Sequence, residues 1–454
     1  MLLEPDVTTS TAEHKGSDTI YALSSGPPPA GIAVIRASGP NVREGLARLL
    51  GSLPEPRRAS LRNIRHPSSG EPIDRGLVIY FAGPASFTGE DCFELLLHGG
   101  RAVVAAALDA LAVLAGFRPA ERGEFSRRAF VAGRMDLTEA EGIADLVAAE
   151  TEAQRRAAFE EARGSNRMRY EAWADGLVRA RALVEAELDF SDEEGVDGAW
   201  AVEGRDLANA IAEEMRAALD AYARARLLRE GLTIVLAGPV NAGKSTLLNA
   251  IAGRDVAITS SEPGTTRDLL EVAVDLAGRR ATLVDSAGMR ETESVVEREG
   301  VRRARTRIAD AQIVLWLSER GRDAPGEAAA AASTVWRVAT KADLATADDL
   351  IRLRNDGWLP LSAKAGDGMA DLIARLGQWA TDAAGSEPSV VNRERHRVAV
   401  IEALGHIDVA IKGTAEEVVA EELRLATEAL GRITGRIDSE RVLDVVFGEF
   451  CIGK

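Results

Sequence analysis

The segment from Gly238 to Ser245 combines glycines, a lysine and a hydroxyl residue at a spacing suited to phosphate chemistry. It follows the apolar run 232–237 and precedes a helix-forming run that begins at Thr246. Glycines let backbone N–H groups converge on phosphates at a helix N-terminus, the lysine reaches the β and γ phosphates, and the serine hydroxyl binds magnesium. The segment therefore predicts a P-loop in which Lys244 holds a nucleoside triphosphate and Ser245 holds Mg²⁺.

Downstream segments supply further groups that a P-loop site needs. Gly264-Thr265-Thr266-Arg267-Asp268 lies before an expected strand, and Thr266 can complete the magnesium shell and sense the γ-phosphate. The expected strand 281–284 ends in Asp285-Ser286-Ala287-Gly288, where the carboxylate of Asp285 can hold magnesium through water. Either segment alone would be interpreted as a turn, so the interpretation depends on their order after the P-loop.

A later pair of loops can read the base. Thr340-Lys341-Ala342-Asp343 is similar to the Asn-Lys-x-Asp loop of GTPases, in which the aspartate accepts hydrogen bonds from N1 and the exocyclic amine of guanine. Adenine lacks this pair of donors, so the loop favours GTP. Thr340 replaces the usual asparagine, and we expect one supporting contact to be weaker. Ser362-Ala363-Lys364 follows the run 358–361 and is the last of the motifs expected around the nucleotide.

These motifs together predict a GTP site. The residues expected to bind GTP are Asn241, Ala242, Gly243, Lys244, Ser245, Thr246, Ser260, Ser261, Glu262, Pro263, Gly264, Thr265, Thr266, Asp285, Ser286, Ala287, Gly288, Thr340, Lys341, Ala342, Asp343, Ser362, Ala363 and Lys364. The expected magnesium ligands are Ser245, Thr266 and, through water, Asp285.

The composition limits the classes of protein that the chain can belong to. Its 454 residues suggest about three domains of ordinary size. The net charge of −16 argues against binding nucleic acid through a uniformly basic surface, so any such contact must be local. The arginines between positions 298 and 307 are one candidate, although a charge run at helical spacing is more often a solvated face.

Cysteine content and hydropathy favour a cytoplasmic protein without membrane contact. The cysteines are Cys92 and Cys451, so no disulfide framework is indicated. The start of the chain lacks the basic and apolar segments of a secretory signal. The nearly apolar run 102–115 is interrupted by Asp109 and is shorter than the ~20 residues that span a bilayer.

The pattern along the chain predicts domains of different class. Residues 1–17 are polar and aperiodic, as in a disordered tail, and residues 18–135 mix short strands with one helix in an α+β pattern. Residues 136–229 and 385–454 are typical of packed helices, while residues 230–384 alternate strands and helices. We therefore predict a multidomain α/β and α protein in which a central helical domain is interrupted by an inserted Ras-like P-loop GTPase domain.

Motifs outside the nucleotide site narrow the family, since Era-like and Der-like GTPases share Gly-Thr-Thr-Arg-Asp. These motifs are Ser86-Phe87-Thr88-Gly89-Glu90-Asp91 with Glu94, His98-Gly99-Gly100, Gly123-Glu124-Phe125-Ser126 with Arg128-Ala129-Phe130, and the terminal Cys451-Ile452-Gly453-Lys454. With them, the chain from Asp18 to Lys454 resembles the MnmE (TrmE) family of tRNA modification GTPases.

The resemblance implies that the N-terminal α+β domain is a dimerising module that binds a folate. Arg36, Glu94, Arg134 and Lys454 match the folate-contacting positions of the family, although position 134 is usually lysine. The expected ligand is 5,10-methylenetetrahydrofolate, with 5-formyltetrahydrofolate as an analogue. Without the resemblance, Arg36 and Glu94 would be interpreted as ordinary surface charges.

Besides Lys244, the resemblance gives two residues a catalytic role. Glu297 matches the position that orients the attacking water, which a carboxylate can do through one bridging water, whereas the local pattern alone indicates a helix-surface glutamate. Cys451 lies near Lys454 and could act in the carbon chemistry, but an inert cysteine is an equal alternative. Prenylation of Cys451 is excluded because Gly453 and Lys454 do not fit its signal.

A potassium ion is predicted to assist hydrolysis. Met289 stands where Ras-like GTPases place the water-orienting glutamine, and no arginine finger is identifiable. The side-chain oxygen of Asn241 can ligate a hard cation beside the phosphates, although a loop-stabilising role is the alternative. By resemblance, Ser260, Glu262 and Thr265 add backbone carbonyl ligands.

The resemblance also implies partners and a reaction. An MnmG-like FAD protein would join the homodimer in a heterotetramer or larger assembly. Together they would add an aminomethyl or carboxymethylaminomethyl group to C5 of the wobble uridine, position 34, of certain tRNAs. GTP hydrolysis would drive association of the GTPase domain, residues 230–384 (the G domain), and a conformational change. An Era/Der-like switch in ribosome assembly is the alternative function, and a scaffold that binds GTP without turnover is a third.

Overall fold

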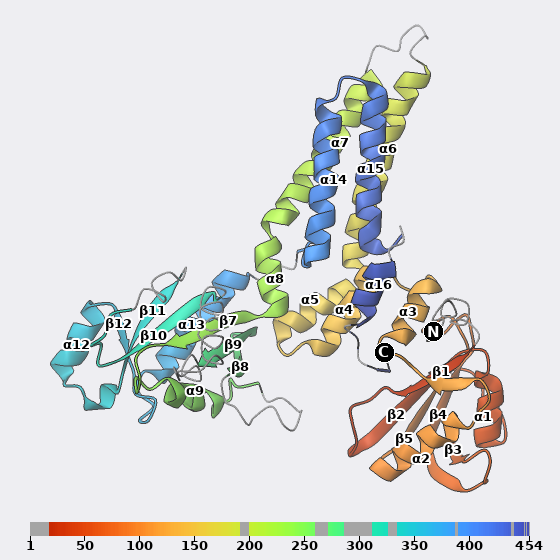
Figure 1. Cartoon of the computed structure of the whole chain (residues 1–454), viewed down its shortest axis with the longest axis horizontal. Coiled ribbons are helices and arrows are strands. Elements are labelled where there is room, and N and C mark those ends of the chain that lie inside the picture. Colours follow the sequence, from red (N-terminus) through yellow and green to blue (C-terminus); the bar gives the residue numbers. More distant parts are fainter. Residues whose placement is uncertain are drawn as a thin grey trace, which may run out of the picture. The chain divides into compact units, whose positions relative to one another are not determined.

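The structure is a computed structural model of the chain, and its parts are shown in Figure 1. It describes residues 18–190, 199–258, 271–285, 311–325, 334–385, 389–436, 440–448, 450 and 452–453. The predicted tail 1–17 lies outside the described residues. By internal contacts the chain divides into two compact units, Met1–Ala144 with Gly431–Lys454, and Asp145–Leu430.

The N-terminal unit is built on a sheet whose strands lie in the order β3-β4-β5-β2-β1-β6. The strands are β1 Thr19–Leu23, β2 Ala30–Ser38, β3 Ser60–Arg65, β4 Pro72–Phe81, β5 Cys92–Gly99 and β6 Phe117–Pro119. The helices are α1 Val42–Leu50, α2 Arg101–Ala112, α3 Glu124–Val131 and α16 Glu440–Gly448, and α4 Leu137–Ala148 begins in this unit. Strands and helices are mixed here, in an α+β arrangement.

Alternation along the strands places one face of this sheet against α1 and α2. In β5, Phe93, Leu95 and Leu97 are buried, as the two-residue period of a strand requires. They pack with Leu46 of α1 and Leu111 of α2 in one cluster. The side chains that alternate with them point to the opposite face, which these helices do not cover.

The C-terminal end of the chain belongs to the N-terminal unit. Helix α16 packs against α3, and the rings of Phe130 and Phe447 lie 6.1 Å apart. The Nε atom of Arg122 donates to the carbonyl oxygen of Phe450 at 3.1 Å. The predicted helical half 385–454 therefore spans both units, because its last helix packs on the N-terminal domain.

The second unit contains a bundle of long helices. Its helices are α5 Glu152–Ala162, α6 Ser165–Asp189, α7 Ala199–Asp220, α8 Tyr222–Glu230, α14 Glu394–Lys412 and α15 Glu416–Thr434. Helix α6 packs along α7, and α7 packs on α14 (Figure 1). Arg205 of α7 pairs with Glu416 of α15 at 2.9 Å, so segments far apart in sequence share one bundle. Among the described helices, none combines the length and apolar character needed to cross a bilayer.

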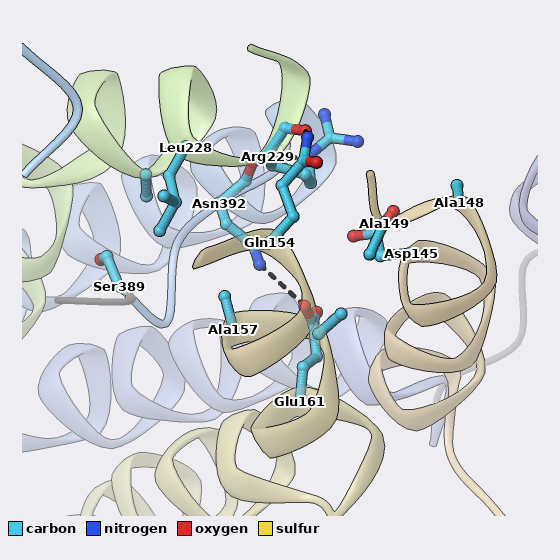
Figure 2. A pocket seen from close by; sticks show the side chains of 12 residues that line it. Asp145, Ala148, Ala149, Gln154, Ala157, Glu161, Leu228, Arg229, Ser389 and Asn392 are labelled. Atoms are coloured by element: carbon cyan, nitrogen blue, oxygen red, sulfur yellow. Dashed lines mark hydrogen bonds between the residues drawn. The ribbon is translucent and has the colours of Figure 1, made fainter. Parts of the chain in front are cut away.

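The two connections between these helices and the second sheet lie side by side around a cavity of about 60 Å³ (Figure 2). Arg229 lies at the end of α8, just before β7, and Asn392 lies just before α14, where the chain returns to the helices. The Nε atom of Arg229 donates to the carbonyl oxygen of Asn392 at 3.3 Å. The Gln154 amide donates to the Arg229 carbonyl oxygen at 2.9 Å, and the Asn392 amide donates to Glu161 at 2.9 Å. Helix α5 thereby holds both connections.

The sheet of the second unit lies in the strand order β12-β11-β10-β7-β9-β8. Its strands are β7 Leu232–Ala237, β8 Glu271–Leu276, β9 Arg279–Asp285, β10 Ile313–Glu319, β11 Val335–Thr340 and β12 Trp358–Pro360. Strand β8 is antiparallel to β9, and the other pairs are parallel. Helices α9 Lys244–Ala252, α12 Ala347–Asn355 and α13 Met369–Ala384 and the short 3₁₀ helix η2 Ala342–Leu344 complete this part.

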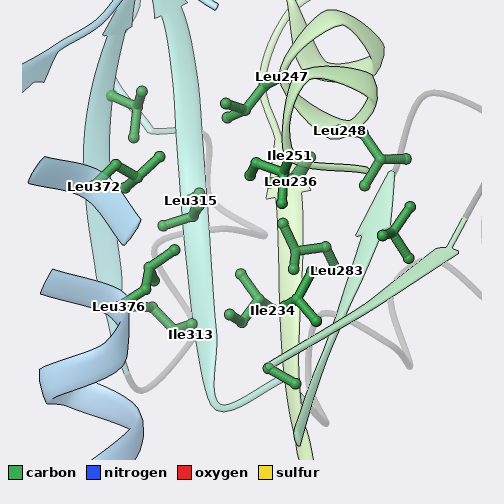
Figure 3. Packing of buried hydrophobic residues seen from close by; sticks show 14 of the residues in the cluster. Ile234, Leu236, Leu247, Leu248, Ile251, Leu283, Ile313, Leu315, Leu372 and Leu376 are labelled. Atoms are coloured by element: carbon green, nitrogen blue, oxygen red, sulfur yellow. The ribbon is translucent and has the colours of Figure 1, made fainter. Parts of the chain in front are cut away.

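Apolar side chains on one face of this sheet form its core with α9 and α13 (Figure 3). Ile234 and Leu315 of the central strands pack with Leu248 of α9 and Leu372 of α13, and all four are at most 2% exposed. A parallel sheet covered by helices needs nearly continuous apolar strands, which is what the run 313–317 provides. Since the central strands are parallel, their carboxyl ends meet at one edge, where the predicted motifs lie.

Candidate functional site

The P-loop joins the end of β7 to the start of α9, and its glycines are required by geometry. Gly238 has φ +143°, and a Cβ there would lie 2.1 Å from the carbonyl oxygen of Leu317. Gly243 has φ +92° and stands at the N-cap of α9. Both conformations favour glycine. The first N–H groups of α9 are therefore directed at the position where a phosphate would bind.

Lys244 is buried within the P-loop. Its Nζ atom donates to the carbonyl oxygens of Gly238 and Pro239, both at 2.8 Å. Burial lowers the pKa of Lys244, and the nearby Asp285 carboxylate partly opposes this shift. A phosphate group would give the ammonium a charged acceptor in place of neutral carbonyls, which strengthens binding.

Two predicted magnesium ligands lie in contact. The hydroxyl of Ser245 donates to Oδ2 of Asp285 at 2.6 Å, and Asp285 is 3% exposed at the end of β9. Hydroxyl and carboxylate oxygens suit Mg²⁺, which is commonly held by few protein ligands together with waters and substrate phosphates. Among the described residues no cluster of three or more His, Cys, Asp or Glu side chains could hold a metal. The Ser245–Asp285 pair could hold a magnesium ion together with nucleotide phosphates.

The loop 340–343, which is predicted to read the base and is called the base-reading loop below, follows β11 and contains a left-handed residue. Lys341 has φ +55°, and its ammonium pairs with the Glu319 carboxylate at 2.6 Å. The hydrogen bond from Lys341 lowers the pKa of Glu319. Asp343 is exposed within η2, so its carboxylate is accessible to a base. The sequence motifs did not include Glu319, although a charged residue at the carboxyl end of an apolar parallel strand marks a candidate site position.

The loop at Ser362 is tied to the base-reading loop. The backbone N–H of Ala342 donates to the carbonyl oxygen of Leu361 at 3.0 Å. Ser362 is 1% exposed, and its hydroxyl accepts from the N–H of Ala365 at 3.1 Å, while Lys364 is exposed. The structure therefore brings together the P-loop, the end of β9, the base-reading loop and the loop at Ser362.

Asn241 lies at the exposed side of the P-loop, with φ +63°. Asparagine tolerates this left-handed conformation better than most residues. Its side chain makes no hydrogen bond with another described residue. The amide oxygen therefore remains available to a ligand beside the phosphates.

In the N-terminal unit, Arg36 and Glu94 are cross-strand partners on the sheet face opposite α1 and α2. They pair across β2 and β5, with the Nη2 atom of Arg36 2.8 Å from the Glu94 carboxylate. The guanidinium also lies over the rings of Phe87 at 5.3 Å and Phe125 at 5.8 Å. Arg134 lies beyond the end of α3. The Glu94 carboxylate could accept hydrogen bonds from a flat heterocycle that packs on Phe87, which is 37% exposed, whereas Phe125 is buried.

Part of the predicted site falls in segments that the structure does not describe. Ser260, Ser261, Glu262, Pro263, Gly264, Thr265, Thr266, Ser286, Ala287, Gly288, Glu297, Cys451 and Lys454 lie outside the described residues. Arg298, Arg302, Arg303, Arg305 and Arg307 also lie there.

Family models match nearly the whole chain. One described as "MnmE helical domain" matches residues 137–451, and one described as "GTP-binding protein TrmE N-terminus" matches residues 19–134. The chain is 50% identical to "tRNA modification GTPase MnmE" of Rhizobium meliloti (strain 1021), over 96% of this chain and 99% of that protein. It is 49% identical to the protein of the same name from Azorhizobium caulinodans, over 97% of this chain and 100% of that protein.

Among solved structures, a variant of Era from Aquifex aeolicus bound to GDP.AlF4- aligns with 40% of this chain and 65% of its own. The sequence identity is 20% and the TM-score is 0.27.

Proposed function

This chain belongs to the MnmE/TrmE family of tRNA modification GTPases, and we propose from that premise that it hydrolyses GTP during wobble-uridine modification of tRNA. The observation that carries the proposal is the convergence of Lys244, the Ser245–Asp285 pair and the Asp343 loop at one edge of a parallel sheet. This arrangement supports a Mg²⁺-dependent site for GTP. A cytoplasmic location agrees with this role.

We assign the chemistry to C5 of uridine 34 in certain tRNAs, where an aminomethyl or carboxymethylaminomethyl group would be added with an MnmG-like FAD partner. Bound 5,10-methylenetetrahydrofolate would supply the one-carbon unit. The pairing of Arg36 with Glu94 beside the exposed Phe87 ring supports a folate site on this sheet face. Arg134, Lys454 and Cys451 are proposed to complete it.

In the nucleotide site, Glu297 is proposed to orient the attacking water, and Thr266 to complete the magnesium shell with Ser245 and Asp285. GTP hydrolysis would change the position of the G domain. The contact of Arg229 with Asn392 supports our proposal that the G domain is inserted into the helical domain, since both connections meet there. A G-domain movement would therefore act on α5 and the bundle through these connections.

An exposed apolar stripe on the N-terminal sheet supports a homodimer through this domain. Leu61 pairs with Leu77 across β3 and β4, and Leu77 pairs with Leu96 across β4 and β5. Leu61 is 55% exposed and Leu77 is 40% exposed. Leu96 and its β2 partner Val34 are half-buried and extend the stripe. A continuous apolar stripe on one sheet face is a feature of protein interfaces.

Leu77→Glu is expected to weaken the homodimer at least about ten-fold, because burying a carboxylate in an apolar interface costs more than burying leucine. Sedimentation equilibrium would give the dimer dissociation constant. Leu53→Glu is a matched control, since Leu53 is 41% exposed in the same unit but outside the strands of this sheet. Equal dimer stability in both variants would refute this interface.

The proposed function is tested by nucleoside analysis of tRNA from cells lacking the protein. We expect the C5-modified wobble uridine to be lost, to return with the wild-type gene, and to stay absent with Lys244→Ala, which removes the phosphate-binding ammonium. A phosphate-release assay on the purified protein separates an enzyme from a GTP-binding scaffold. Normal tRNA modification together with defective ribosome assembly would instead favour the Era/Der-like alternative.

A further inference from the structure

Thr340 links the base-reading loop to the P-loop. It is the last residue of β11 and is 4% exposed. Its hydroxyl lies 2.8 Å from the carbonyl oxygen of Ala242 and 3.3 Å from that of Ser318. Ala242 belongs to the P-loop, and Ser318 lies near the end of the neighbouring strand β10. One hydroxyl thus contacts the backbone of both neighbouring segments.

Both contacts use the same hydrogen of Thr340. Carbonyl oxygens accept only, and a hydroxyl carries one hydrogen, so its donor capacity is spent on the protein backbone. Since Ala242 and Ser318 are at most 2% exposed, water cannot easily replace this donor. The hydroxyl is therefore held in place and has no hydrogen for a ligand.

Guanine has a second edge that a donor could read. The amine and N1 lie on the edge assigned to Asp343, while N7 is an acceptor on a different edge of the base. An asparagine amide has two hydrogens, so one can bind a carbonyl and the other a base. Threonine at this position offers one donor hydrogen, which is already bonded to the Ala242 carbonyl oxygen.

We propose that Thr340 is a positioning residue that fixes the base-reading loop to the P-loop, and that the chain selects guanine without a side-chain donor from position 340 to N7. The proposal rests on GTP binding at this site. A Cβ on Gly243 would lie 3.8 Å from the Thr340 side chain, so the loop also packs directly against the N-cap of α9. Displacement of Thr340 would disturb base and phosphate binding together.

The first test compares GTP with 7-deaza-GTP, which lacks the N7 acceptor. Wild-type protein is expected to bind both within about two-fold in a competition assay, because no side-chain hydrogen bond to N7 is lost. Thr340→Asn is expected to gain a preference of about five-fold for GTP, since the amide adds a donor. Much weaker binding of 7-deaza-GTP than of GTP by the wild-type protein would overturn the proposal that position 340 supplies no donor to N7. The absence of a new preference for GTP in Thr340→Asn would also overturn it.

The second test removes the link to the P-loop. Thr340→Val keeps the shape and loses the hydroxyl, so GTP and 7-deaza-GTP should both bind about ten-fold more weakly, while Thr340→Ser should restore the affinity. Thr233→Val is the matched control on β7, and melting temperatures identify any loss of folding. A Thr340→Val protein that is folded and binds GTP like the wild type would refute the positioning role.

These outcomes separate the inference from the proposed function. If the wild-type protein bound no guanine nucleotide, the GTP site itself would be wrong, and the inference would fail with it. If GTP bound tightly and 7-deaza-GTP bound weakly, the GTP site would stand and the role given to Thr340 would be wrong.

Discussion

Asp343→Asn is expected to change the base preference of the protein from guanine to xanthine. The Asp343 carboxylate is exposed in η2, within a loop held by Thr340 on one side and by the Ala342–Leu361 hydrogen bond on the other. A carboxylate accepts from N1 and the exocyclic amine of guanine. Xanthine carries a carbonyl oxygen at C2, to which an asparagine amide can donate while its oxygen accepts from N1–H.

The expected loss in GTP affinity is at least about 100-fold, because a site built to hydrogen-bond a group rejects a mismatched partner strongly. The affinity for xanthosine triphosphate should rise by a similar factor. Competition against a fluorescent nucleotide measures both affinities. Asp348→Asn, an exposed carboxylate at the start of α12, is the matched control and should change neither. Unchanged GTP binding by Asp343→Asn would show that another loop reads the base.

The local elements of the nucleotide site could be predicted because their signals are local. The pattern of 232–246 predicts a strand, a glycine-rich turn and the start of a helix, and β7 and the first residues of α9 lie there. The order of the strands could not be predicted in this way. Strand β10 pairs with β7, although β8 and β9 lie between these two strands in sequence. Such pairing depends on contacts between distant residues, which periodicity does not contain.

The contacts that a side chain makes with distant residues also could not be predicted from local sequence patterns. The sequence predicts that Thr340 weakens one supporting contact, whereas its hydrogen bond to the Ala242 carbonyl oxygen can be seen only in the structure. The pairing of Arg36 with Glu94 depends on the register of β2 against β5. A shift of one residue would place either side chain on the opposite face. Only the family resemblance gave these residues a role from the sequence.

GTP hydrolysis is expected to depend on potassium, through Asn241. Met289 cannot orient water as a glutamine does, and a cation can supply the charge that an arginine finger provides in other GTPases. Asn241 is exposed beside the P-loop, and its side chain makes no hydrogen bond with another described residue. The available amide oxygen supports the cation-ligand interpretation, while the left-handed backbone of Asn241 also fits a loop-stabilising role. Backbone carbonyls of Ser260, Glu262 and Thr265, which lie outside the described residues, are proposed to complete the site.

The measurement is GTP turnover and G-domain association in KCl and NaCl at equal ionic strength. Wild-type turnover should be at least about ten-fold faster in KCl, a modest share of what an arginine finger contributes. Asn241→Ala should lose most of this difference, because the side-chain oxygen that ligates the cation is gone. Asn249→Ala, on the exposed side of α9, should keep the full potassium response. Equal turnover in both salts, or a full response in Asn241→Ala, would exclude a potassium ion held by Asn241.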